Sequence, residues 1–230
     1  MTAASHGQFY LDLHTHSVDG SNDATATVES YVRWIARRRE LGYRIDGFVL
    51  TEHRSLDLTL DYSSLAASYD VVVLRGIEVE TDVGHVLVYG VSEGFFREVD
   101  IANPFFGHAE IFRAATDHGG IAVGAHAGRD RIGLAGHVDD QRVAPGVIDV
   151  IEGLNGGSSD EENARAMKLA SDHDLVTVGG SDAHHTTSIG RFITAFREPV
   201  TSIEALAEHL RVGHVRPAAA EQTLAAAECA

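Results

Sequence analysis

Short apolar runs rich in valine and isoleucine alternate with segments of helical periodicity along most of the chain, and this alternation limits the fold more than any other feature. It is typical of βα units, in which a helix covers each strand of a parallel sheet. Seven runs have the length and composition of such strands: 9–13, 47–51, 71–79, 121–125, 147–153, 175–180 and 191–196. The run 84–90 is expected to be an extra strand. Because there is no internal linker and no repeat of fixed period, the sequence favours one α/β barrel over two domains.

Capping patterns mark where two of the later helices are expected to begin. Ser158 and Ser159 each stand three residues before a glutamate, and Thr201 stands three residues before Glu204. In a capping box, the hydroxyl of the capping residue accepts a backbone N–H of the first turn, and the acidic side chain accepts the backbone N–H of the capping residue. The sequence therefore predicts helices that open near 158–159 and near 201.

Side chains able to bind a metal ion follow six predicted strands in succession, always at the carboxyl end. They are His14 and His16, His53, Glu78, His126, Glu152 and Asn155, and Asp182 and His184. One histidine after one strand is usually a loop or capping residue. A ligand-type residue after each of six strands is hard to produce by chance, and in a parallel barrel these strand ends converge on one mouth. The sequence therefore predicts a polar site at that mouth.

Five motifs resemble those of the polymerase and histidinol phosphatase (PHP) superfamily of metal-dependent phosphoesterases. They are DLHTH at 12–16, TEH at 51–53, GIEV at 76–79 with a histidine at 85, GAHAGR at 124–129, and GSDAH at 180–184. The resemblance implies a single stand-alone PHP domain over 1–230, with its motifs in a core of about 9–196. It also implies a distorted (β/α)7 TIM-like barrel that holds a metal site at the C-terminal ends of the strands.

By this resemblance, nine residues would hold two or three divalent ions: His14, His16, Asp23, His53, Glu78, His85, His126, Asp182 and His184. Glu78 would bridge the ion held by His14, His16 and Asp182 to a second ion held by His85 and His126. The third ion would take His53, His184 and an early aspartate. The common pattern places that aspartate where Asn22 stands, so Asp23 is the expected ligand and Asp19 is the alternative.

The donor types agree with this implication. Six imidazoles and three carboxylates without sulfur suit zinc, manganese or iron, and they are too many for one closed structural zinc site. Metal ions close together activate a water molecule and stabilise charge on a phosphoryl group. We therefore expect a phosphoric ester hydrolase that acts on a small phosphorylated substrate, preferably a phosphomonoester, through a metal-bridging hydroxide. Glu78 and Asp182 are the expected catalytic carboxylates, and Arg129, three residues after His126, is expected to bind the phosphate bidentately.

Two other functions remain open from the sequence. An amidohydrolase-type metal hydrolase shares the His-x-His pair, but its two-metal members often need a bridging lysine, and Lys168, the only lysine, lies in a predicted helix. The other alternative is a PHP domain that binds metal without catalysis. Glu152 and Asn155 would order the ligands or contact the substrate, and His185 would donate a proton or face solvent.

Charge and composition bound the expected partners and location. With 18 basic and 34 acidic residues, the net charge is −16, which predicts a small-molecule substrate and no extended nucleic acid. No run is long enough for a membrane span, and Cys229 is the only cysteine, so a cytoplasmic protein without membrane contact is expected. Four aromatic residues are candidate walls of the mouth: Tyr62, Phe95, Phe96 and Phe105.

Overall fold

The computed structural model describes residues 8–104 and 106–220, so Phe105 and Cys229 lie outside the described residues. Nine strands form one sheet: β1 Phe9–Thr15, β2 Gly47–His53, β3 Val72–Thr81, β4 Gly84–Tyr89, β5 Ile121–Gly124, β6 Val150–Asn155, β7 Val176–Gly180, β8 Phe192–Phe196 and β9 Val215–Ala219. The helices are α1 Val28–Glu40, α2 Ser63–Tyr69, α3 Glu93–Glu98, α4 His108–Asp117, α5 Leu134–Asp139, α6 Asp160–His173 and α7 Ile203–Val212. Within these ranges, no helix has the length and apolar character needed to cross a membrane.

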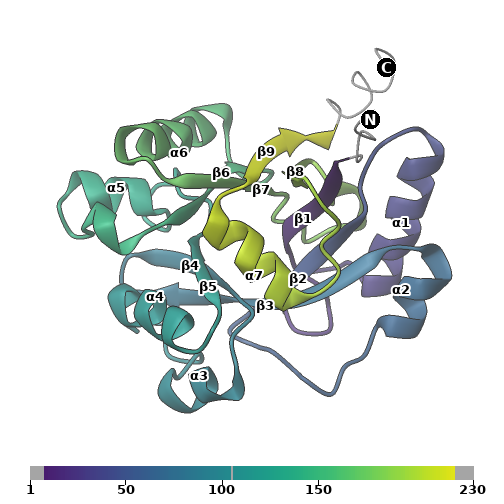
Figure 1. Ribbon diagram of the computed structural model, residues 1–230, viewed down its shortest axis with the longest axis horizontal. Coiled ribbons are helices and arrows are strands. Elements are labelled where there is room, and N and C mark those ends of the chain that lie inside the picture. Colours follow the sequence, from purple (N-terminus) through teal and green to yellow (C-terminus); the bar gives the residue numbers. More distant parts are fainter. Residues whose placement is uncertain (1–7, 105, 221–230) are drawn as a thin grey trace, which may run out of the picture.

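The sheet has the order β7-β6-β5-β4-β3-β2-β1-β8-β9 and curls into a nearly closed barrel (Figure 1). β1, β2 and β3 are parallel, as are β5, β6 and β7, while β4 lies antiparallel between β3 and β5. A parallel bridge from Thr15 to Ala183 joins the end of β1 to the chain that leaves β7. The expected α/β barrel is confirmed, with the run 84–90 as its extra strand.

Two strands depart from the expected βα pattern. β8 was expected to follow that pattern, but it pairs antiparallel with β1. The connection after β7 is only 181–191, which is shorter than a parallel crossover of a dozen or more residues. β9 was not expected, because its sequence VRPAA contains a proline and two alanines, which are depleted in strands. It forms as an edge strand that pairs antiparallel with β8.

The interior of the barrel is apolar at one end and polar at the other. Leu11, Leu13 and Val49 pack inside the barrel with other buried aliphatic side chains. Leu206 and Leu210 of α7 join the same cluster, and this helix lies across the barrel (Figure 1). Two further apolar clusters fill the space between the sheet and the outer helices. α7 thus closes one end of the barrel. The other end, at the carboxyl ends of the parallel strands, is the open mouth.

Capping explains where α6 begins. Ser159 is the N-cap, its hydroxyl accepts the N–H of Glu162, and the Glu162 carboxylate accepts the N–H of Ser159. Ser158, the other candidate, lies one residue outside the helix. The predicted box at Thr201 is wrong by one residue, because Ser202 caps α7 and accepts the N–H of Ala205.

Replacing the α6 cap gives a small and measurable loss of stability. We expect Ser159→Ala to lower the free energy of unfolding by about 1 kcal/mol, because an N–H of the first turn loses its acceptor. Urea unfolding at fixed metal content measures this change. Ser171→Ala, at an exposed position of the same helix, is the matched control and should cause no loss, since alanine is the better helix former. Equal effects of the two substitutions would contradict the capping role.

Candidate metal centre

The first strand delivers two histidines to the mouth through an irregularity in its pairing. The register between β1 and β2 shifts between Asp12 and Thr15, and bulges of this kind re-aim side chains. Leu13 still packs inside the barrel, whereas His14 and His16 reach the polar mouth, where both are fully buried.

Glu78 lies at the centre of the polar cluster and is 1% exposed. Its Oε1 is 3.0 Å from His85 Nδ1 and 3.2 Å from His126 Nε2. Its Oε2 is 2.9 Å from His53 Nδ1 and 3.5 Å from His16 Nε2. Oε1 also lies 3.5 Å from His14 Nε2. Each oxygen of this carboxylate therefore contacts its own set of histidines, which is the arrangement that a bridging ligand requires.

A second group joins β1 to the chain after β7. Asp182 Oδ1 is 3.5 Å from His14 Nε2 and 3.4 Å from His16 Nε2, and the two histidine Nε2 atoms are 3.0 Å apart. Three groups of side chains have ligand atoms close enough for a shared ion: His14, His16 and Asp182; Glu78, His85 and His126; and His16, His53 and His184. The structure thus brings together eight of the nine predicted ligands in these groups, and Asp23 lies beside the last.

The hydrogen bonds of His14 and His16 test whether a cation fits between them. His14 Nδ1 is 3.1 Å from Glu152 Oε2, so this nitrogen carries the proton. His16 Nδ1 is 3.3 Å from Ser21 Oγ, and that hydroxyl donates to Glu52 Oε2 at 2.5 Å, so Ser21 accepts from His16. If each ring is neutral, with its proton on Nδ1, then each Nε2 carries a lone pair, and the two lone pairs point at each other. Two lone pairs 3.0 Å apart repel unless a proton or a metal ion lies between them, so the site fits a cation.

Electrostatics lead to the same conclusion. Burial lowers the pKa of His16 to about 4, so this ring is neutral near pH 7. Burial also opposes a charge on His14, but the carboxylates of Glu152, Asp182 and Glu78 outweigh it and raise the pKa of His14 well above its usual value. The buried carboxylates therefore stabilise a positive charge at this place, which a proton supplies when no metal ion does.

Two atoms of the cluster lack partners within the described residues. Glu78 Oε2 has no aligned hydrogen bond, although His53 Nδ1 is 2.9 Å away, and His126 Nδ1 has none. A buried polar atom without a partner costs free energy, and for the Glu78 oxygen a coordinated ion would replace the missing bond. This orphaned oxygen and the facing lone pairs show that the residues present fit divalent metal ions.

Backbone strain coincides with the cluster. His126 has a φ of 30° and Asp182 a φ of 54°, and Arg54, which follows His53, has a φ of 50°. The left-handed region is unfavourable for residues other than glycine, and such strain tends to concentrate at functional sites.

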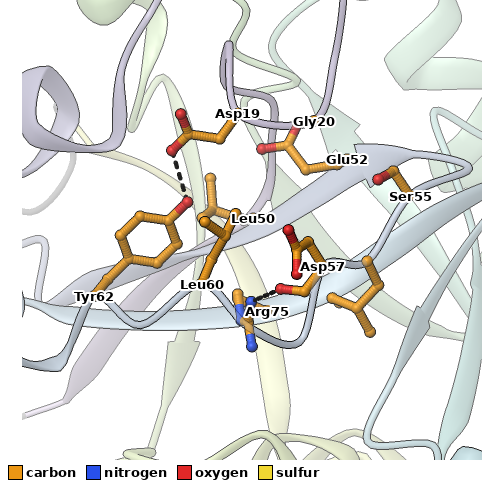
Figure 2. Close-up of a pocket in the computed structure, with 11 residues that line it drawn as sticks. Asp19, Gly20, Leu50, Glu52, Ser55, Asp57, Leu60, Tyr62 and Arg75 are labelled. Atoms are coloured by element: carbon orange, nitrogen blue, oxygen red, sulfur yellow. Dashed lines mark hydrogen bonds between the residues drawn. The ribbon is translucent and has the colours of Figure 1, made fainter.

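The structure separates the two candidates for the early aspartate. Asp23 Oδ2 is 3.3 Å from His53 Nε2 and 3.4 Å from His184 Nε2. Asp19 instead accepts a hydrogen bond of 2.6 Å from the hydroxyl of Tyr62, and Figure 2 shows the two side chains meeting at a pocket that Glu52 also lines. The geometry therefore favours Asp23 as the ligand.

Several supporting residues were not identified from the sequence. The buried Glu52 accepts hydrogen bonds from the hydroxyls of Ser17 and Ser21, both at 2.5 Å. The buried Asp12 accepts the N–H of Ser181 at 2.8 Å and that of Gly190 at 2.7 Å, and burial raises its pKa to about 6. Asp12 lies within the DLHTH motif and Glu52 within the TEH motif. Their position inside these motifs is the sequence feature that could have identified them as supporting residues.

Other expected contributors take different places. Lys168 pairs with Asp172 on the surface of α6, away from the cluster, so no lysine bridges the ligands there. His185 is exposed and its Nδ1 is 2.7 Å from Thr25 Oγ1. Phe95 is fully buried in an outer apolar cluster and is not a wall of the mouth.

Comparisons with known proteins agree with this fold. A family model described as PHP-associated matches residues 160–215. PsfC from Pseudomonas syringae is similar over 96% of each chain, with 18% identity and a TM-score of 0.67. A protein described as a metal-dependent phosphoesterase, from Bifidobacterium adolescentis, is 19% identical, with 90% of this chain and 96% of that chain covered and a TM-score of 0.58. A search of curated proteins gives no significant match. The PHP resemblance is confirmed, and the structural likeness shows the shared barrel fold.

One expectation about partners is wrong. Endonuclease Q, in a complex with a 27-mer duplex that carries an abasic lesion at the active site, is 18% identical with a TM-score of 0.60. The match covers 90% of this chain and 57% of that one. Extended nucleic acid can therefore reach the active site of a protein with this fold. The net charge could not exclude a nucleic-acid substrate, because it sums charges over the whole surface. The electrostatic potential at an active site that holds metal ions is set mainly by those ions.

Proposed function

We propose that the protein is a metal-dependent phosphoesterase. The observation that carries this proposal is the position of Glu78, whose two oxygens face two separate groups of histidines in a buried cluster. Two or three ions of zinc, manganese or iron would be held by His14, His16, Asp23, His53, Glu78, His85, His126, Asp182 and His184. When bound, they would lower the pKa of a water molecule and neutralise charge on the phosphoryl oxygens.

The chain's own residues prepare the ligands for this task. Glu152 and Ser21 hold the Nδ1 protons of His14 and His16, and the carbonyl oxygen of Asp182 holds that of His184 at 2.9 Å. Each of these three histidines therefore leaves Nε2 available to bind an ion without having to rotate. Supporting hydrogen bonds of this kind fix the tautomer and the orientation of metal-binding histidines.

Charge favours a phosphomonoester among phosphate esters. Three ions would carry about six positive charges, against the three carboxylates of Asp23, Glu78 and Asp182. The surplus stabilises a doubly charged monoester more than a singly charged diester. An amidohydrolase reaction is less well supported, because Lys168 pairs with Asp172 on the surface of α6 and Glu78 would fill the bridging role instead.

Metal analysis provides the first test. We expect protein purified from cells supplied with zinc, manganese and iron to contain more than one equivalent of transition metal, because nine side chains converge. A chelator should abolish hydrolysis, and adding back one of these ions should restore it. Metal-free protein from such cells, or full activity in chelator, would contradict the proposal.

A substrate screen on the same sample tests the reaction. We expect hydrolysis of a phosphomonoester such as a sugar phosphate or a nucleotide to exceed that of a phosphodiester. Duplex DNA with an abasic site, an amide and a lactone complete the screen. Preferential cleavage of the duplex would keep the phosphoesterase class and change the substrate, whereas preference for the amide or lactone would reject the class.

A further inference from the structure

Arg129 was expected to bind phosphate, but most of its guanidinium is already engaged. Nη2 donates to Asn155 Oδ1 and to Asp182 Oδ2, each at 2.8 Å, and Nε donates to Ser158 Oγ at 3.0 Å. These bonds use three of the five N–H groups of an arginine. Only Nη1 makes no bond within the described part of the chain, so a bidentate fork is not available in this conformation.

The carboxylate of Asp182 divides its oxygens between two tasks. Oδ1 faces the Nε2 atoms of His14 and His16 at 3.5 and 3.4 Å, whereas Oδ2 pairs with Arg129 at 2.8 Å. Asp182 also has a left-handed backbone, with a φ of 54°. A residue in such a conformation needs its surroundings to hold it, and the guanidinium fixes which oxygen faces the histidines.

The guanidinium itself cannot move freely. Asn155 Oδ1 also accepts the N–H of Gly157 at 2.9 Å, which orders the loop beside it. A Cβ on Gly157 would lie 2.2 Å from Arg129 Nη2 and 3.2 Å from Asp182 Oδ2. The loop backbone therefore packs directly against the ion pair, and Arg129 is 19% exposed.

The same asparagine connects this ion pair to the opposite side of the centre. Asn155 Nδ2 donates to Glu152 Oε2 at 2.8 Å. Glu152 in turn accepts the N–H of His126 at 2.6 Å and contacts His14 Nδ1 at 3.1 Å. One buried chain of hydrogen bonds thus runs from the supports of His14 and His126, through Asn155, to Arg129.

We propose that Arg129 is a positioning residue of the metal centre, which holds Asp182 in its ligand orientation through the network Glu152–Asn155–Arg129–Asp182. This inference rests on the proposed function, because it requires that Asp182 binds an ion. It assigns the residue to metal affinity rather than to the direct binding of phosphate.

The test measures the binding of Mn²⁺ to chelator-stripped and dialysed protein by titration calorimetry, without any activity assay. We expect Arg129→Ala to weaken at least one Mn²⁺ site by about 10- to 100-fold, the range for losing a partner of a metal ligand. Arg129→Lys should recover part of the affinity, since an ammonium can still pair with Asp182 but cannot also reach Asn155 and Ser158. Ser158→Ala should weaken Mn²⁺ binding less than either Arg129 substitution does.

The matched control is Arg165→Ala. Arg165 pairs with Asp130 at 2.9 Å and Asp139 at 3.3 Å, neither of which is a candidate ligand, so Mn²⁺ affinity should remain at the wild-type value. Melting curves in chelator check that each variant folds. If Arg129→Ala does not fold, Arg129→Lys and Ser158→Ala carry the test.

Titration with inorganic phosphate in the presence of Mn²⁺ distinguishes the two roles of Arg129. Unchanged Mn²⁺ affinity in the Arg129 variants together with weakened phosphate binding would overturn the proposal and restore the phosphate-binding role. Failure of the wild-type protein to bind Mn²⁺, Zn²⁺ or Fe²⁺ would reject the proposed function itself. The variants and the wild type therefore test the two proposals separately.

Discussion

Glu78→Gln should lower turnover by on the order of 10³-fold while the fold is retained. The amide nitrogen cannot bind a cation, so one of the two groups of histidines loses its shared carboxylate oxygen. The change is nearly isosteric and keeps an acceptor oxygen, and Glu152 and Asp182 still stabilise the charge on His14, so the metal-free protein should keep its fold with a lower melting temperature. Turnover of the best substrate at saturating metal and the melting temperature in chelator measure the two parts of this prediction.

The control for Glu78→Gln is a glutamate-to-glutamine substitution at the protein surface. Glu29→Gln, on an exposed turn of α1 where the carboxylate pairs with Arg33, should leave turnover unchanged. If Glu78→Gln kept near-wild-type turnover with full metal content, the reactive water would have to be activated elsewhere. A variant that failed to melt cooperatively would instead show that this carboxylate is needed for folding.

Glu152→Ala should lower the free energy of unfolding by about 3–5 kcal/mol in chelator near pH 6. Glu152 is 1% exposed and accepts from His126 N–H, His14 Nδ1–H and Asn155 Nδ2–H. Its removal leaves these donors buried without an acceptor and leaves the charge on His14 without its neighbouring carboxylate. Glu152→Gln, which keeps an acceptor oxygen, should lose less.

The pH dependence of this loss follows from His14. Its raised pKa means that the folded protein binds this proton more tightly than the unfolded chain. The resulting stabilisation is complete below the unfolded pKa of about 6.5 and is lost as the pH rises through the folded value. The difference between wild type and Glu152→Ala in urea unfolding should therefore shrink toward alkaline pH. A difference below about 1 kcal/mol at all pH values would contradict this role.

Local pattern was sufficient to predict the barrel and to bring most of the candidate ligands to one mouth. Valine-rich runs of strand length and the helical periodicity between them depend on residues that are neighbours in the chain. All eight predicted strands therefore appear at or near their predicted positions. The ligands could be predicted for a related reason. Parallel strands bring their carboxyl ends to one mouth, so a residue such as His53 or Glu78 is placed by its position at the end of its own strand.

Tertiary structure decided what depends on contacts between distant segments. The direction of β8 follows from a short connection, and β9 exists only because β8 offers it an edge. Asp23 is favoured over Asp19 because it lies beside His53 and His184, which come from distant segments. The partners of Arg129 likewise depend on where Asn155 and Asp182 lie. Hydrogen bonds and ion pairs act over a few ångströms in space, whatever the separation in the chain. Glu152 and His14 are 138 residues apart in the chain and in contact in the fold, so no local pattern could pair them.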